Sequence, residues 1–221
     1  TLAHEVQNPL GGIKGMLQLL ERDLKDSGME TEPAKMMFSE IERIERLLKQ
    51  LLMHSHPMPI KSQSFNLHEL LDTVLSFERS SHPGLRFTAY YDASLPDIEA
   101  DRDKLHQVFL NLVRNASEAC PADGRVRVLT RHCAHWELAG TNLDPTRRYI
   151  LVSIEDEGPG IPEELRKNIF KPLFSTKKQG TGLGLSISFR LVESHGGQLR
   201  YQPSERSGAC FQVILPESQS E

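Results

Sequence analysis

The sequence predicts an α plus α/β protein, in which a helical hairpin forms a dimeric four-helix bundle and is followed by a two-layer α/β sandwich. In the N-terminal part of the 221 residues, apolar side chains recur in steps of three and four, the period of amphipathic helices. After a proline-containing segment, short alternating strand patterns are interleaved with helical ones. We therefore divide the chain into a hairpin over residues 1–58, a linker over residues 59–64 and a second domain over residues 65–221.

Two apolar stripes define the hairpin. The first occupies Leu2, Val6, Leu10, Ile13, Leu17, Leu20 and Leu24, and the second occupies Met37, Ile41, Ile44, Leu48 and Leu51. One hairpin cannot bury both stripes, so we expect a second copy to complete the bundle and the chain to be a homodimer. Because the first stripe already begins at Leu2, we also expect the chain to be a fragment that starts within a helix. The parent protein could then carry a sensor part or a membrane anchor ahead of this fragment.

The second domain has the pattern of a sheet covered by helices on one side. Periodicity predicts helices near residues 67–77, 101–119, 163–170 and 183–195, and strands near residues 85–91, 126–131, 148–155, 199–201 and 209–215.

Composition excludes several classes of function. A formal charge of −4 gives no basic surplus for nucleic acid, and the apolar runs fall well short of the roughly 18 residues that span a bilayer, so we expect no membrane contact in this fragment. The three cysteines lack CxxC spacing, which indicates a reducing compartment and hence a cytoplasmic location. His132, Cys133 and His135 have no fourth ligand at a suitable spacing, so we expect no metal there.

Asn111 and Asn115 share a face of the helix predicted over residues 101–119, away from its apolar stripe. Side-chain oxygens of this type suit a hard cation such as Mg²⁺ with its waters and bound phosphates. The alternative is an ordinary solvated polar face.

Two glycine-containing motifs follow. In "EDEGPGIP", residues 155–162, Asp156 ends a strand where it can accept hydrogen bonds from an exocyclic amine, and Gly158 and Gly160 let the backbone approach a flat ring. A simple Asp-Gly turn is the alternative. In "GTGLGLS", residues 180–186, a glycine-rich stretch opens a helix whose free N–H groups favour phosphate.

The order of these motifs resembles the nucleotide-binding domain shared by sensor histidine kinases, gyrase-type topoisomerases, mismatch-repair ATPases and the ninety-kilodalton heat-shock chaperones. The N, G1, F and G2 boxes correspond to residues 111–115, 156–160, 170–174 and 180–184. The resemblance implies bound Mg-ATP, with Asn115 and Asn111 at the metal, Asp156 at the adenine amine and residues 170–182 as a lid. The implied nucleotide contacts are Asn111, Asn115, Asp156, Gly158, Gly160, Phe170, Lys177, Lys178, Thr181, Gly182, Leu183 and Gly184. The chain departs from the family at Glu118, where many sensor kinases carry a lysine.

The opening stretch, "AHEVQNPLGGIKG", resembles the H box of histidine kinases of the nitrogen-regulation type. The resemblance implies that His4 is the phosphoacceptor, with the near-neutral pKa that leaves imidazole nucleophilic. It further implies that Glu5 is a general base and that Asn8 orients a water for phosphate removal.

The resemblance implies a sensor kinase core that autophosphorylates His4 and relays the phosphoryl group to a response regulator receiver domain, of the enhancer-binding transcription type by the H box. Phosphatase activity toward that regulator is also implied. Two alternatives stay open: a conformational ATPase of the same fold, and a phosphotransfer scaffold that does not use ATP.

Overall fold

The computed structural model divides into two compact units, Thr1–His56 and Pro57–Glu221, which we describe separately. It describes residues 2–27, 31–33, 36–41, 59–177, 181–204 and 208–217, with the backbone alone for residues 2–11, 18 and 26.

In the first unit, helix α1 runs over Leu2–Asp26, and residues 36–41 are again helical. The two segments contact each other, because the Nζ atom of Lys14 lies 4.9 Å from the centre of the Phe38 ring. Leu17 and Ile41, one from each predicted stripe, are buried. The first stripe therefore forms the predicted helix, whereas Ile44, Leu48 and Leu51 of the second lie outside the described residues.

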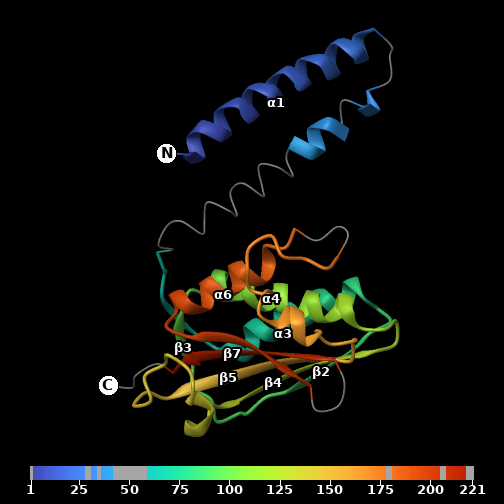
Figure 1. Cartoon of the computed structure of the whole chain (residues 1–221). Coiled ribbons are helices and arrows are strands. Elements are labelled where there is room, and N and C mark those ends of the chain that lie inside the picture. The colour runs from blue at the N-terminus through green and yellow to red at the C-terminus, as the bar shows by residue number, and fades with distance from the viewer. Residues whose placement is uncertain are drawn as a thin grey trace. The chain divides into compact units, whose positions relative to one another are not determined.

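The second unit is built on a five-stranded mixed sheet with the order β2-β4-β5-β7-β6. Its strands are β2 (Arg86–Tyr90), β4 (Arg125–His132), β5 (Tyr149–Asp156), β6 (Gln198–Pro203) and β7 (Ala209–Pro216). Strands β2 and β4 are parallel and the other neighbouring pairs are antiparallel. Helices α3 (Leu67–Ser81), α4 (Arg102–Ala119) and α6 (Gly184–Ser194) cover one face of this sheet (Figure 1). The two-layer α/β prediction is confirmed.

The core lies between the helices and the sheet because each element has a largely apolar inner face. Helix α4 buries six apolar side chains there: Leu105, Val108, Phe109, Leu112, Val113 and Ala116. Its N-terminus is set by Asp101, whose side chain accepts a hydrogen bond from the backbone N–H of Lys104 at 3.2 Å. Capping and burial together hold α4 in one orientation. The candidate site described next lies along this helix.

Several short elements differ from the sequence prediction. Gln63 and Ser64, predicted as the end of the linker, belong to β1 (Gln63–Phe65), which pairs with β3 (Ile98–Ala100). These three-residue strands are too short for alternation to reveal them, and their partners are distant in sequence. Helix α5 covers only Glu163–Arg166 instead of residues 163–170, because the chain continues in turns closed by hydrogen bonds from an N–H group to the carbonyl three residues earlier.

No helix in the described ranges combines the length and the apolar character that crossing a membrane requires.

Candidate nucleotide-binding site

Helix α4 is contacted along one side by three other parts of the second unit. The start of α6 meets it at Asn111, Lys177 meets it at Asn115 and Glu118, and the loop after β5 meets it at Ala119. Residues 111 and 119 are about 12 Å apart along a helix axis. The three parts therefore contact α4 along roughly this length of its axis.

At one end, Asn111 ties α4 to α6. Its Nδ2 atom donates a hydrogen bond to the Oγ atom of Ser188 at 3.0 Å. A Cβ atom added to Gly184 would lie 2.2 Å from Asn111 Oδ1, so a side chain at the first residue of α6 would displace the Asn111 side chain. The Asn111 side chain thus holds two helices together, which leaves Asn115 as the better placed of the two asparagines for a metal ion.

Among the described residues, the one at the N-cap position of α6 makes no side-chain cap hydrogen bond. The residue at the cap position is Leu183, which is fully buried and has no oxygen to offer the first turn. Its N–H group is 3.4 Å from Thr181 Oγ1, while the N–H groups of the first turn point out of the helix end. Such an end favours a phosphate through its N–H groups and its dipole. Leu183 can contribute only its backbone to a ligand.

At the other end, Asp156 closes β5 and is 2% exposed. Its Oδ1 atom accepts hydrogen bonds from the N–H groups of Gly158 at 2.8 Å and Ala209 at 3.1 Å. Burial raises the pKa of this carboxyl above its ordinary value, against the opposing effect of the two N–H donors. Because both bonds in the described residues fall on Oδ1, the Oδ2 atom is the one oriented for a ligand's donor group.

Glycines around Asp156 are required by the protein's own backbone. A Cβ atom on Gly158 would lie 2.7 Å from the carbonyl oxygen of Ala119, and one on Gly160 would lie 2.9 Å from that of Gly208. Gly208 itself has φ +86°, and its Cβ would lie 2.0 Å from the Asp156 carbonyl oxygen. Close packing within the protein thus accounts for these glycines. Gly208 is a site residue that the sequence analysis missed, since no motif marks it.

Phe170 and Gly182 begin and end the segment predicted as a lid, residues 170–182, of which residues 178–180 lie outside the described residues; it is called the lid segment below. The Phe170 ring packs against that of Phe189 on α6, with centroids 5.3 Å apart. Gly182 has φ +66°, and a Cβ there would lie 2.4 Å from the carbonyl carbon of Leu173, which itself has φ +64°. Gly182 therefore lies directly against the backbone of Leu173 in the same segment. Lys178, also predicted to contact nucleotide, lies outside the described residues.

Lys177 brings a positive charge to the asparagine face of α4. Its Nζ atom lies 3.5 Å from Asn115 Oδ1 and forms an ion pair with Glu118. The exposed fractions of the Lys177 and Glu118 side chains are 43% and 42%, so the pair is accessible to solvent and to a ligand.

Arg127 supports the loop after β5 from the other face of the sheet. This arginine is 4% exposed, and its guanidinium donates to Glu155 at 3.1 Å and to Glu157 at 3.2 Å. The two carboxylates flank Asp156 in sequence, so Arg127 fixes the backbone on both sides of it. Sequence reasoning missed this residue because a strand arginine has no spacing signature.

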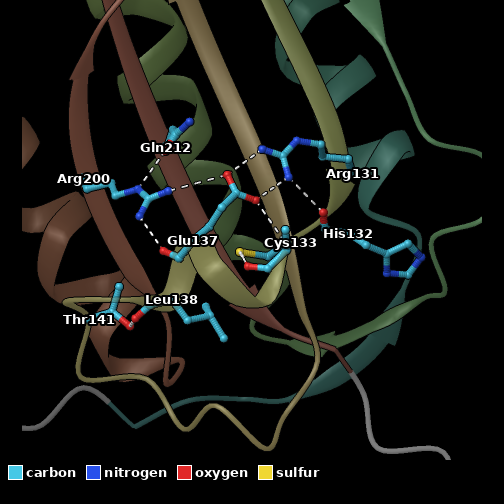
Figure 2. Close-up of polar contacts among 9 residues, drawn as sticks. Arg131, His132, Cys133, Glu137, Leu138, Thr141, Arg200 and Gln212 are labelled. Atoms are coloured by element: carbon cyan, nitrogen blue, oxygen red, sulfur yellow. Dashed lines mark hydrogen bonds and ion pairs between the residues drawn. The ribbon is translucent and has the colours of Figure 1, made fainter.

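The loop over residues 134–146 packs on the sheet face opposite the helices, held there by Glu137 (Figure 2). The Glu137 carboxylate accepts hydrogen bonds from Arg131 at 2.5 and 2.6 Å and from the N–H of Ala134 at 2.9 Å. Below it, Leu138 joins a small apolar cluster with Tyr149, Leu151 and Ile214. The loop is therefore a structural cover over this part of the sheet.

The three residues predicted to carry phosphoryl chemistry, His4, Glu5 and Asn8, all have helical backbone within α1. Their side chains lie outside what the structure describes. Elsewhere in the described part of the chain, no group of three or more His, Cys, Asp or Glu side chains is arranged to hold a metal ion.

This geometry belongs to a known class. Residues 100–219 match the family model described as histidine kinase-, DNA gyrase B-, and HSP90-like ATPase, and residues 1–56 match the His Kinase A phospho-acceptor domain model. The chain belongs to the histidine kinase-type ATPase family, and it joins that domain to a phospho-acceptor segment.

Individual relatives are similar over most of the chain or nearly all of it. The sensory histidine kinase/phosphatase NtrB of Azospirillum brasilense is 37% identical over 97% of this chain and 54% of its own length. The catalytic domain of histidine kinase ThkA is 32% identical, with a TM-score of 0.61 over 71% of this chain and 96% of that one. In the structure of ThkA in complex with the response regulator protein TrrA, the matched chain is 30% identical, with a TM-score of 0.64. The match covers 98% of this chain and 60% of that one. The chain spans about half to three-fifths of the length of the curated relatives it matches.

Proposed function

We propose that this chain is the transmitter core of a two-component sensor histidine kinase. In this proposal His4 takes the γ-phosphoryl group of ATP and passes it to an aspartate of a response regulator. The observation that carries it is the combination, in one chain, of a phospho-acceptor segment and an ATPase domain with the α4-centred site. A conformational ATPase needs no phospho-acceptor segment, and a scaffold needs no nucleotide site.

The proposed nucleotide lies along α4 with its base near Asp156 and its phosphates near α6. Asp156 Oδ2 accepts a hydrogen bond from the adenine amine, and the first-turn N–H groups of α6 bind phosphate oxygens. Lys177 offsets phosphate charge beside Asn115. The base end is buried and the phosphate end is accessible, which suits a substrate whose terminal phosphate must reach another segment.

The residues present fit a magnesium ion. The Asn115 side-chain oxygen is half-buried on the phosphate side of α4, and Mg²⁺ usually takes one or two protein oxygens besides waters and phosphates. Asn115 would hold the ion, and Asn111 would support it from its position between the helices. The bound ion would neutralise charge that builds up on the phosphates during transfer.

In the proposed transfer, an unprotonated ring nitrogen of His4 attacks the γ-phosphorus. A nitrogen–phosphorus bond forms, the bond to the β–γ bridging oxygen breaks, and ADP leaves with that oxygen. Glu5 takes up the proton from the other ring nitrogen as general base. Most of the rate enhancement is expected from positioning and charge neutralisation.

The phosphoryl group is then proposed to pass to a receiver-domain aspartate, with His4 as leaving group. Asn8 would orient a water in the reverse task of removing phosphate from that aspartate. The relatives named kinase/phosphatase and the ThkA complex with a response regulator support this part of the proposal. The H-box resemblance favours a regulator of the enhancer-binding transcription type, and a cytoplasmic location follows from the need for ATP and that partner.

We also propose a homodimer through the hairpin. Two side chains of the α1 stripe, Ile13 and Leu20, are 43% and 46% exposed in the single chain. A second hairpin would bury this apolar surface in a four-helix bundle.

Incubation with γ-labelled ATP and Mg²⁺ tests the proposal, with His4→Gln as the key variant and His132→Gln as the matched control. The expected label is acid-labile and alkali-stable, as a phosphoramidate is, and it disappears in His4→Gln but persists in His132→Gln. Asp156→Asn should abolish labelling by removing nucleotide binding.

Each alternative gives a different result. Phosphate release from ATP without label on the chain would favour the conformational ATPase. A chain that binds no nucleotide, in a longer version as well as this one, would favour the scaffold.

A further inference from the structure

We infer that Glu118 is a positioning residue for Lys177, and that the two together supply the cation that many sensor kinases carry on the equivalent turn of the helix. This inference rests on the proposed function, because it assigns the pair to the triphosphate of bound ATP. It predicts that Glu118 favours ATP binding despite its negative charge.

The pair joins two parts of the chain that are 59 residues apart in sequence. Glu118 projects from the last turns of α4, and Lys177 comes from the lid segment. The Lys177 ammonium is at the same time 3.5 Å from Asn115 Oδ1, the atom proposed to face the metal and phosphates. Glu118 therefore holds the lysine beside the reacting end of the nucleotide.

The charges explain why both residues are needed. A carboxylate alone at this position would repel the phosphates, and a lysine alone would lose side-chain entropy on being fixed there. An ammonium group has three N–H donors, so Lys177 can keep its bond to Glu118 and donate another to a phosphate oxygen. The carboxylate thus orders the lysine side chain before the nucleotide binds, and the lysine neutralises the charge of the carboxylate.

Exposure sets the size of the effect. Both side chains are more than two-fifths exposed, and exposed ion pairs contribute little by themselves. The pair should therefore matter for recognition of the γ-phosphate and hardly at all for folding.

The test compares the affinities of the chain for ADP and for a non-hydrolysable ATP analogue, both with Mg²⁺, by calorimetric titration. The ratio of the two dissociation constants is the preference for the triphosphate. Lys177→Ala should lower this preference about tenfold, while affinity for ADP changes less than about twofold. Glu118→Ala should lower it by about two- to fivefold, the range of an exposed pair.

The decisive measurement is Glu118→Ala in the Lys177→Ala background. Here the removed carboxylate no longer holds a lysine, so the preference should stay unchanged or rise. The exchanged pair, Glu118→Lys with Lys177→Glu, puts the cation on α4 and should restore the preference to within about threefold of the unmodified chain. Lys167→Ala and Glu164→Ala, which remove the same charges from exposed positions on and beside α5, should leave it unaffected.

Three results would overturn the inference while leaving the proposed function intact. They are a rise in triphosphate preference with Glu118→Ala alone, equal effects of that change in both backgrounds, and equal losses for ADP and the ATP analogue. If the unmodified chain bound neither nucleotide, the proposed function would fail with it.

Discussion

Gly184 and Asn111 meet so closely that a Cβ atom on Gly184 would lie 2.2 Å from the Asn111 side-chain oxygen. The asparagine cannot easily turn away, because its Nδ2 atom donates to Ser188 one turn further along α6. This contact fixes the start of α6, with its open N–H groups, against the asparagine face of α4. Several measurable consequences follow from it and from the other contacts of the site.

Gly184→Ala should lower the free energy of unfolding by about 1 kcal/mol, the usual worth of the Asn111–Ser188 hydrogen bond that the methyl group would break. Helix propensity alone predicts the opposite sign, since alanine is the better helix former. Chemical denaturation measures the difference. In an Asn111→Ala background the same change should cost nothing, and an equal cost in both backgrounds would rule out the proposed clash.

Asp156→Asn should stabilise the nucleotide-free chain while removing ATP binding. The pKa of Asp156 is raised by burial, so the folded state binds the proton more tightly than the unfolded state does. Stability from this group is therefore present at low pH and is lost as pH rises from the ordinary aspartate range through the raised pKa.

Thermal denaturation across pH tests this sign. At pH 7 the variant should have a Tm about 2–4 °C higher, because a gain on the order of 1 kcal/mol in the free energy of unfolding shifts the Tm of a domain of this size by that amount. Below pH 4 the two proteins should converge. A variant that is less stable at pH 7 would contradict the assignment of burial as the dominant effect.

Gly182→Ala should weaken ATP binding by about tenfold or more, because its left-handed backbone costs roughly 1–2 kcal/mol for a side chain and its Cβ would strike Leu173. Gly140→Ala is the matched control. Gly140 also has a positive φ, +77°, but no atom lies within 4 Å of its Cβ position, and it is in the loop on the other sheet face. The control should lose similar conformational energy and keep full nucleotide affinity.

Glu137→Ala should destabilise the second unit by about 1–3 kcal/mol without changing ATP affinity. The carboxylate is buried, and its removal leaves the Arg131 guanidinium without the acceptor of two short bonds. Arg131 is partly exposed, which keeps the cost below that of a fully buried pair. The neighbouring Trp136 is the chain's single tryptophan and is 75% exposed, so its fluorescence reports on this loop directly.

Glu137 gives the stability of the chain a pH dependence of opposite sign to that of Asp156. Hydrogen bonds from Arg131 lower the pKa of Glu137, so its contribution to stability is complete above the ordinary glutamate range and is lost as pH falls through the lowered pKa. The acid-induced loss of stability should be smaller in Glu137→Gln than in the unmodified chain. An unchanged acid limb would show that Glu137 does not contribute to it.

Periodicity carried most of the fold prediction, since helices α1, α3, α4 and α6 and strands β2 and β4–β7 follow from repeats of apolar residues within single segments. The pairing of β1 with β3 did not follow, because three residues hold too little pattern and the partners are far apart in sequence. The predicted end of α5 was wrong for a related reason. Consecutive turns with hydrogen bonds between residues i and i+3 space their apolar side chains much as a helix does.

Motif spacing likewise predicted nucleotide contacts at Asn115, Asp156 and Gly184, because a ligand site is expected to impose residue types at fixed intervals along one segment. Local sequence holds no trace of Gly208 behind Asp156, of Arg127 bridging Glu155 and Glu157, or of Lys177 reaching Glu118. Those partnerships join segments that are distant along the chain and meet only when the sheet and its helices assemble. Residue order was thus enough to indicate the chemistry, whereas the tertiary structure decided which side chains support it.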